Sequence, residues 1–337
     1  MKVTIHAGCY QQMAARQVAE EVARGWRAVT TDEVSVVVAG TSPREIAELF
    51  AAPTSHVTAT NFCGQVTTMP LYESAEGVYL DPSDLLDPGG TAQKADGAYV
   101  LGKGSAGLGQ ALWQLRDKPH IYVGLAHAAA VDGGAAMLAE LGEDAAPILA
   151  KTTAIVSFDR PLLGLDGSAA DVRPVREDER WKAQKHATAV AAFFRDLEKR
   201  YPRPLKGQDL LRSRGWGRRD GSGMGGGAAA LVGQLGGEIV SAATWVRGHV
   251  TLPESDLDIV VTSSLHPQNM GFSWAAAVAE QRQPQGTPVV VACAESSLSR
   301  HELAAWGVHG QMVAASPPGD IGIRLARTWS PNKVTCS

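Results

Sequence analysis

Short apolar runs, each followed by a helical pattern, occupy both ends of this 337-residue chain. Residues 34–39 show no alternation with polar residues, and the same holds for 257–262 and 288–293. Such runs are typical of strands buried on both faces of a parallel sheet. Parallel neighbours need a crossover, usually a helix, so the alternation of strands and helices predicts an α/β fold.

Helix starts are also marked in the sequence. Ser42–Glu45 and Ser299–Glu302 both have a serine followed three residues later by glutamate, which is a capping box. We therefore expect helices to begin at Pro43 and Arg300. Residues 14–29 place Val18, Val22 and Trp26 on one helical face, which predicts an earlier helix.

The length of the chain favours two domains, since single cores seldom exceed about 250–300 residues. The two ends resemble each other in pattern and the middle differs. We expect residues 1–60 and 255–330 to form one discontinuous domain, with 61–254 inserted as a second α/β domain. Residues 73–97, rich in Asp, Pro and Gly, are predicted to be an irregular loop.

Within the inserted part, the sequence predicts strands at 98–101, 121–125 and 153–158 and helices at 106–117 and 182–200. The helix over 182–200 has the clearest pattern, with an apolar face opposite Arg195, Glu198 and Lys199.

Composition excludes several classes of protein. The apolar fraction is 45% and the net charge is −4, which gives no basic footprint for nucleic acid. The densest basic run, Arg212–Arg219, is more typical of a solvated loop than of a phosphate site. No apolar run is long enough to span a membrane, and the N-terminus lacks a signal-peptide pattern. The four cysteines form no CxxC pair, so we expect neither a zinc site nor a disulfide framework, and a cytoplasmic location fits best.

A glycine-rich loop precedes the apolar run 228–235. It contains five glycines: Gly221, Gly223, Gly225, Gly226 and Gly227. A loop of this kind before a helix can present N–H groups to a phosphate. The alternative is a close crossing of two backbone segments, which also requires glycine.

A second glycine segment, 102–109, matches GxGxxG and includes Gly104, Ser105 and Gly107. A dinucleotide fold would place an acidic residue about 20 positions later, and the strand at 121–125 has none. A phosphate cradle with Lys103 and a simple strand–helix turn both remain open, with the turn favoured.

Two aspartates occupy positions suited to chemistry. Asp132 precedes a predicted helix, where it can cap the helix or hold a metal or a substrate hydroxyl. Asp159 follows the strand at 153–158, at an edge where α/β enzymes often place carboxylates, although turns carry them too.

Taken together, these segments resemble the bacterial type-I glycerate kinase family in order and spacing. The matching segments are the opening strand and helix, "GSAGLGQAL" (104–112), "VGLAHAAAVDGGAAMLAELG" (123–142), "FDRPLLGLDGSA" (158–169), "GSGMGGGAAALVGQLGGEI" (221–239) and "SDLDIVVT" (255–262). The resemblance implies a Rossmann- or flavodoxin-like domain built from both chain ends, an inserted α/β domain, and a cleft between them. It also implies ATP-dependent phosphorylation of D-glycerate with Mg²⁺.

The sequence departs from the family pattern at charged positions. The acid and lysine of the first family loop are missing from Gly8–Met13. In a later family motif, Ser264, His266 and Gln268 replace a glutamate, an arginine and an aspartate, and Ala275 replaces a lysine that follows it. In the segment around 104–112, Leu108 and Gln110 replace a threonine and a glutamate. Val131 replaces an asparagine. Asp132 and Asp159 are retained, and Arg176 takes the place of a lysine. Phosphoryl transfer depends on positioning and charge neutralisation, so these losses predict a degenerate active site.

The resulting hypothesis is a glycerate kinase-like protein with weak, altered or lost activity. Its candidate catalytic residues are Asp132, Asp159 and His266, with the two aspartates as metal ligands. Its candidate phosphate-binding residues are Lys103, Gly104, Ser105, Gly107, Arg176 and the five glycines of 221–227. The alternative is a non-catalytic relative that binds a small anionic metabolite or a partner protein, and a homodimer also stays open.

Overall fold

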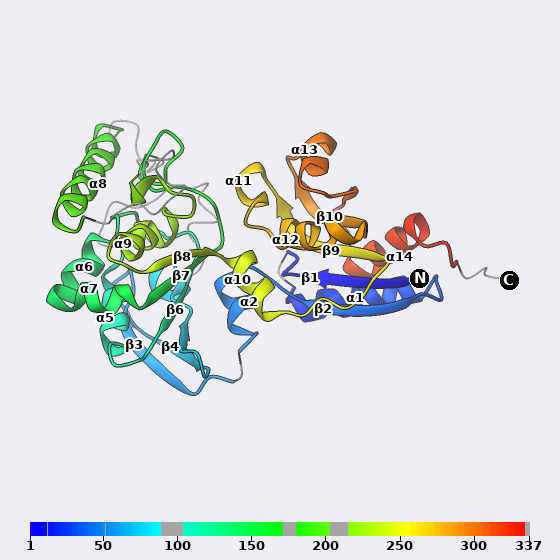
Figure 1. Ribbon diagram of the computed structural model, residues 1–337, viewed down its shortest axis with the longest axis horizontal. Helices are drawn as coiled ribbons and strands as arrows, with labels where there is room; N and C mark the ends of the chain where they lie inside the picture. Colours follow the sequence, from blue (N-terminus) through cyan, green and yellow to red (C-terminus); the bar gives the residue numbers. More distant parts are fainter. Residues whose placement is uncertain (12, 51, 89–103, 171–179, 203–214, 334–337) are drawn as a thin grey trace. The chain divides into compact units, whose positions relative to one another are not determined.

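The computed structural model describes residues 1–11, 13–50, 52–88, 104–170, 180–202 and 215–333. The chain divides into two compact units (Figure 1): Met1–Thr41 with Ala242–Ser337, and Ser42–Ser241. Each unit has its own sheet with helices against it, so the chain has a two-domain α/β fold.

The first unit contains a five-stranded parallel sheet in the order β11-β10-β9-β1-β2. Its strands are β1 (Lys2–Ala7), β2 (Glu33–Val38), β9 (Leu257–Leu265), β10 (Val289–Ser296) and β11 (Gly310–Val313). Its helices are α1 (Ala15–Arg27), α10 (Ala242–His249), α11 (Pro267–Met270), α12 (Trp274–Arg282), α13 (Arg300–Ala305) and α14 (Pro318–Trp329).

The core of this unit forms where α1 and α14 cover one face of the sheet. Val18, Val22 and Trp26 of α1 pack with Ile5 of β1 and Ile321 of α14, all fully buried. The predicted stripe of α1 is therefore the face that makes the core. α12 packs against β9 and β10.

The second unit contains a six-stranded mixed sheet in the order β3-β4-β5-β6-β7-β8. Its strands are β3 (Ser55–Thr60), β4 (Val66–Glu73), β5 (Val78–Leu80), β6 (Ile121–Leu125), β7 (Thr152–Val156) and β8 (Glu238–Ser241). Strands β3, β4 and β5 pair antiparallel, whereas β5 to β8 are parallel. Its α-helices are α2 (Pro43–Ala47), α3 (Ser83–Leu86), α5 (Ala106–Gln114), α6 (Ala135–Leu141), α7 (Ala145–Ala150), α8 (Arg180–Arg200) and α9 (Ala228–Gln234).

Both predicted capping boxes are present. The Ser42 and Ser299 side chains accept the N–H groups of Glu45 and Glu302, and each glutamate accepts the N–H of its serine. No helix among the described residues is long and apolar enough to cross a membrane.

The structure differs from the sequence-based expectation in several places. Residues 34–39 were expected to be buried on both faces, but β2 is the edge strand of its sheet, and Val37 alone of its six residues is buried. Residues 73–97 are not wholly irregular, because β5 and α3 lie within them. β5 is only three residues long, and its neighbours β4 and β6 make it a strand. The unit boundaries also differ from 60/61 and 254/255: β3 pairs with β4 in the second unit, and α10 packs on α12 in the first. The predicted strand at 98–101 lies outside the described residues.

Candidate functional site

Three loops meet at the carboxyl ends of β6 and β7 in the second unit. The glycine loop contacts both others: Gly225 N–H donates to Ala126 O at 2.8 Å, and Gly221 N–H donates to Asp159 O at 2.7 Å. Gly133 N–H in turn donates to Gly226 O at 2.9 Å. The structure therefore brings Asp132, Asp159 and the glycine loop together, at the sheet edge where parallel α/β proteins bind ligands.

The glycine loop is a close crossing of backbone segments. A Cβ added at Gly226 would lie 2.2 Å from Ala130 O, and one at Gly227 would lie 2.6 Å from Gly133 Cα. Both glycines have positive φ, +67° and +100°. The N–H groups of Gly221, Gly223 and Gly225 all donate to main-chain carbonyls. These three donors are used within the protein and are not presented to a phosphate.

Asp132 is held by hydrogen bonds around both carboxylate oxygens. Its Oδ2 accepts the Ser105 hydroxyl at 2.7 Å, the Ser105 N–H at 3.2 Å and the Ala136 N–H at 3.3 Å. Its Oδ1 accepts the Gly134 N–H at 2.9 Å. The side chain thus caps the first turn of α6 and ties that turn to the segment that opens α5.

The GxGxxG segment is also tightly packed. A Cβ at Gly107 would lie 2.1 Å from Thr60 O, and one at Gly104 would lie 2.7 Å from the Ala130 Cβ. Ser105 Oγ accepts the Met137 N–H at 3.0 Å in addition to donating to Asp132. Lys103 and Arg176, the two predicted phosphate-binding cations, lie outside the described residues.

Asp159 has a different environment. Partial burial, with the nearby Asp220 carboxylate adding to it, raises the pKa of Asp159 to about 6. A carboxyl group with a pKa close to neutral can exchange protons at physiological pH, as a general base must. Asp220 was missed in the sequence because no local motif marks it and only the fold brings it near Asp159.

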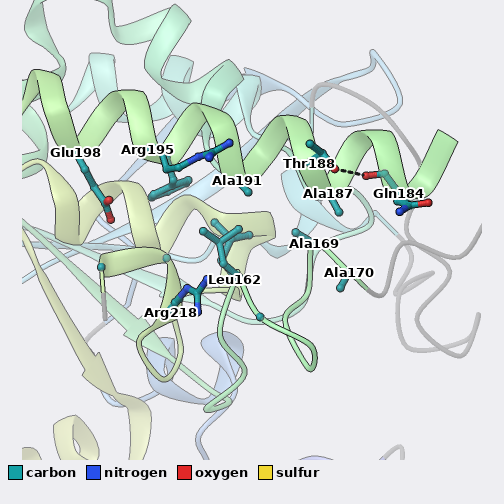
Figure 2. Close-up of a pocket in the computed structure, with 15 residues that line it drawn as sticks. Leu162, Ala169, Ala170, Gln184, Ala187, Thr188, Ala191, Arg195, Glu198 and Arg218 are labelled. Atoms are coloured by element: carbon teal, nitrogen blue, oxygen red, sulfur yellow. Dashed lines mark hydrogen bonds between the residues drawn. The ribbon is translucent and has the colours of Figure 1, made fainter. Parts of the chain in front are cut away.

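A pocket of about 620 Å³ opens beside these loops, between α8, residues 162–170 and residues 215–218 (Figure 2). Arg195 and Glu198 extend from α8, and Arg218 lies across the pocket from that helix. Arg218 belongs to the basic run 212–219, which we expected to be a solvated loop. At this residue the run instead lines the pocket. The next arginine, Arg219, lies over the Trp216 ring at 4.0 Å.

In the first unit, the carboxyl edge of the sheet has a topological switch between β1 and β9. The chain runs from β1 to β2 on one side and from β9 through β10 to β11 on the other, and such a point is where open α/β sheets bind ligands. Gln11 after β1 has φ +55°, and its N–H donates to Ser263 Oγ at 2.8 Å. Gln11 lies in the loop Gly8–Met13, where the family's acid and lysine are missing, whereas no motif marks Ser263.

His266 lies at this edge of the first unit, whereas Asp132 and Asp159 belong to the second. Its Nδ1 is 2.8 Å from Ser297 Oγ, and its N–H donates to Asn269 Oδ1 at 2.8 Å. It therefore begins α11 and is positioned by a serine of the β10 loop.

The acidic residues fit Mg²⁺ unequally. The oxygens of Asp132 are already occupied by N–H and O–H donors, which a cation would have to displace. Asp159 and Asp220 are close enough to affect each other electrostatically. Mg²⁺ in nucleotide sites takes one or two carboxylates, with water and phosphate completing the shell, and this pair would suit it. Among the described residues no group of three or more His, Cys, Asp or Glu side chains could hold a metal.

Comparisons with known proteins bear on the fold. A solved structure from Salmonella typhimurium LT2, described as "putative glycerate kinase 2", matches with a TM-score of 0.62 over 97% of this chain and 98% of that one. The chain has a glycerate kinase-like fold. The sequence identity to that structure is 17%, so the similarity supports the fold and no conclusion about activity.

Sequence comparison finds uncharacterized proteins of Mycobacterium bovis and Mycobacterium tuberculosis. Each is 25% identical over 353 residues, covering 97% of this chain and 87% of the relative. No protein-family model matches the chain.

Proposed function

We propose that this protein is a glycerate kinase-like protein in which ATP-dependent phosphorylation of D-glycerate, or of a related hydroxy acid, is strongly weakened. The observation that carries the proposal is Asp132, whose carboxylate is used to cap a helix on a fold shared with a glycerate kinase-like structure. With that acid used structurally, and the glycine-loop donors bonded internally, Asp159 is the candidate with the best-suited environment.

In this proposal Asp159 holds a proton taken from the substrate hydroxyl, because its pKa of about 6 allows the exchange near neutral pH. If MgATP binds, the neighbouring Asp220 carboxylate would hold the Mg²⁺, which neutralises phosphate charge when bound, and Asp159 would keep the role of base. Arg195 and Arg218 would then attract the anionic part of a ligand in the neighbouring pocket.

The test is ADP release that depends on D-glycerate, with saturating MgATP and high enzyme concentration. Kinases typically turn over at about 1–100 s⁻¹, and each missing electrostatic group costs about 10²–10³ in rate. We expect turnover below about 0.1 s⁻¹, and Asp159→Asn should abolish it. Asp144→Asn, an exposed site, is the matched control.

A turnover within the ordinary kinase range would contradict the weakened activity. Thermal denaturation with and without ligand is the second test, because a ligand at about 100 times its Kd adds about 2.7 kcal/mol to the free energy of unfolding. No change with MgATP or D-glycerate would contradict the glycerate kinase-like function. Stabilisation by D-glycerate without turnover would instead favour the second candidate, a non-catalytic protein that binds a small anionic metabolite. The arginines that line the pocket in Figure 2 support this candidate, because they would attract an anion.

A further inference from the structure

Another pocket lies in the first unit, along the edge strand β11. Its volume is about 690 Å³, and its walls come from β11, α13 and the C-terminal half of α14. β11 is the last strand in the sheet order, so no described strand covers its outer side. The volume is in the range of pockets that hold small organic molecules.

This pocket lies away from the carboxyl edge of the sheet. It reaches Gly310, the first residue of β11, and Val290 near the start of β10, which is its partner in register. Ser263 and His266, by contrast, lie at or beyond the carboxyl end of β9. The pocket is thus a separate site, and the inference does not depend on the proposed function.

The apolar wall of the pocket is built around one glycine. Trp329 lies so close to Gly310 that a Cβ there would be 2.6 Å from Cζ2 of the indole. Leu303 of α13 and Leu325 of α14, both almost fully buried, complete the apolar surface. A half-buried indole beside an open strand edge offers a flat surface for a planar ligand.

Both charged side chains that line the pocket are arginines, Arg300 and Arg324. His309 also lines it, and no aspartate or glutamate does. Among the described residues neither Arg300 nor Arg324 forms an ion pair with a carboxylate. His309 Nδ1 accepts the Val289 N–H at 3.2 Å, which leaves Nε2 as the protonated, donating nitrogen.

A second copy of the chain is a poor occupant. Pairing of two β11 edges would bring four arginines to one interface with no acid among the lining residues, and like charges repel there. We propose that this pocket binds a small organic anion with a planar apolar body. The body lies against Trp329, and the carboxylate or phosphate group pairs with Arg300 and Arg324.

The test is calorimetric titration of the full chain with 2-naphthoate as the probe. We expect saturable binding at one site, with an affinity that depends on Arg300 and Arg324. Arg324→Ser and Arg300→Ser should each weaken it about tenfold, as expected for a hydrogen bond to a charged group. The neutral analogue 2-naphthalenemethanol should bind at least about tenfold more weakly for the same reason. Arg327→Ser is the matched control, because Arg327 is exposed on the same helix and does not line the pocket.

Both arginines are exposed, so the variants should keep the fold, and circular dichroism checks this. Two results would overturn the inference. One is the absence of saturable binding up to about 10 mM probe, which corresponds to less than about 3 kcal/mol of binding. The other is an affinity that the Arg300→Ser/Arg324→Ser double variant leaves unchanged, which would place the probe elsewhere.

Discussion

At the scale of single residues, Asp132 and Asp159 show how the fold assigns different roles to the same side chain. Both follow strands that end at one edge of the second sheet. Asp132, 9% exposed, accepts four hydrogen bonds from the two segments it joins. Asp159 lies near another carboxylate, and its pKa rises to about 6. The first arrangement uses the carboxylate to join two segments, and the second makes protonation of the carboxyl group easier.

Replacement of Asp132 by asparagine should therefore destabilise the protein. The amide nitrogen cannot accept a hydrogen bond, so in either orientation of the amide the donors that reach one of the two carboxylate oxygens lose their partner. We expect a loss of about 2 kcal/mol in the free energy of unfolding, measured by urea denaturation. Asp144→Asn should change it by less than about 0.5 kcal/mol. An Asp132→Asn variant as stable as the parent would mean that the carboxylate is available to a ligand.

At the scale of elements, the glycine loop is determined by packing. Gly226 has φ +67° and ψ +21°, and Gly286 has nearly the same conformation at +67° and +16°. A Cβ at Gly226 would meet Ala130 O at 2.2 Å, whereas one at Gly286 would meet nothing within 4 Å. The two positions differ mainly in the space around them.

Alanine substitution at both positions separates backbone strain from packing. Gly286→Ala should cost about 1 kcal/mol from the left-handed conformation alone. Gly226→Ala should cost at least about 3 kcal/mol, because a backbone oxygen must move as well. Thermal denaturation of the two variants measures the difference. Equal losses would show that the loop has room for a side chain and would weaken the case for a tight crossing.

The elements predicted well from sequence are those whose signal is local. Strands β2, β9 and β10 appear as continuous apolar runs, and the capping boxes mark the starts of α2 and α13. The run does not distinguish the edge strand β2 from the buried strands β9 and β10. β3 and β4 were missed because they pair antiparallel and mix exposed polar residues with buried ones.

The candidate site was predictable only in part, for a similar reason. Capping by Asp132 was one of the roles open from the sequence, since the residues it serves follow it directly. The effect of Asp220 on Asp159 joins residues about sixty positions apart and has no local signature. The carbonyl groups that accept from the glycine N–H groups belong to residues at least as distant in the chain.

At the scale of the whole molecule, a buried polar network joins the two ends of the chain within the first unit. His6 Nε2 lies 2.6 Å from Asp258 Oδ1, and Arg282 Nε donates to Asp258 Oδ2 at 2.8 Å. Trp274 Nε1 donates to His6 Nδ1 at 3.3 Å, so Nε2 carries the proton and His6 is neutral. Burial lowers the pKa of His6 accordingly.

This network makes stability depend on pH. Below His's ordinary pKa of about 6.5 the unfolded chain binds a proton that folded His6 does not, so stability falls as pH decreases from there toward the lowered pKa. Burial acts to raise the pKa of Asp258, but hydrogen bonds from His6, Ser255 and Arg282 outweigh it and leave the pKa lowered. The Asp258 contribution is therefore lost only at more acidic pH.

The expected size is up to about 1.4 kcal/mol per pH unit for one proton. Urea denaturation at several pH values between about 5 and 8 measures it. His6→Gln should reduce the slope below pH 6.5 by up to one proton, and His301→Gln, at an exposed site of α13, serves as the control. A slope that His6→Gln leaves unchanged would mean that His6 is charged in the folded protein.

The division of the chain into a continuous and a discontinuous unit leads to the last prediction. Residues 42–241 contain all six strands of their sheet, whereas the other sheet needs β1 and β2 from one end and β9 to β11 from the other. A fragment of residues 42–241 should fold alone, because every strand keeps its neighbours and its core. A fragment of residues 1–241 should carry residues 1–41 unfolded, since β1 loses β9 and α1 loses the packing of α14. Circular dichroism and hydrogen exchange test both fragments: protected amides in β1 of the longer one, or no cooperative unfolding of the shorter one, would show that the units depend on each other to fold.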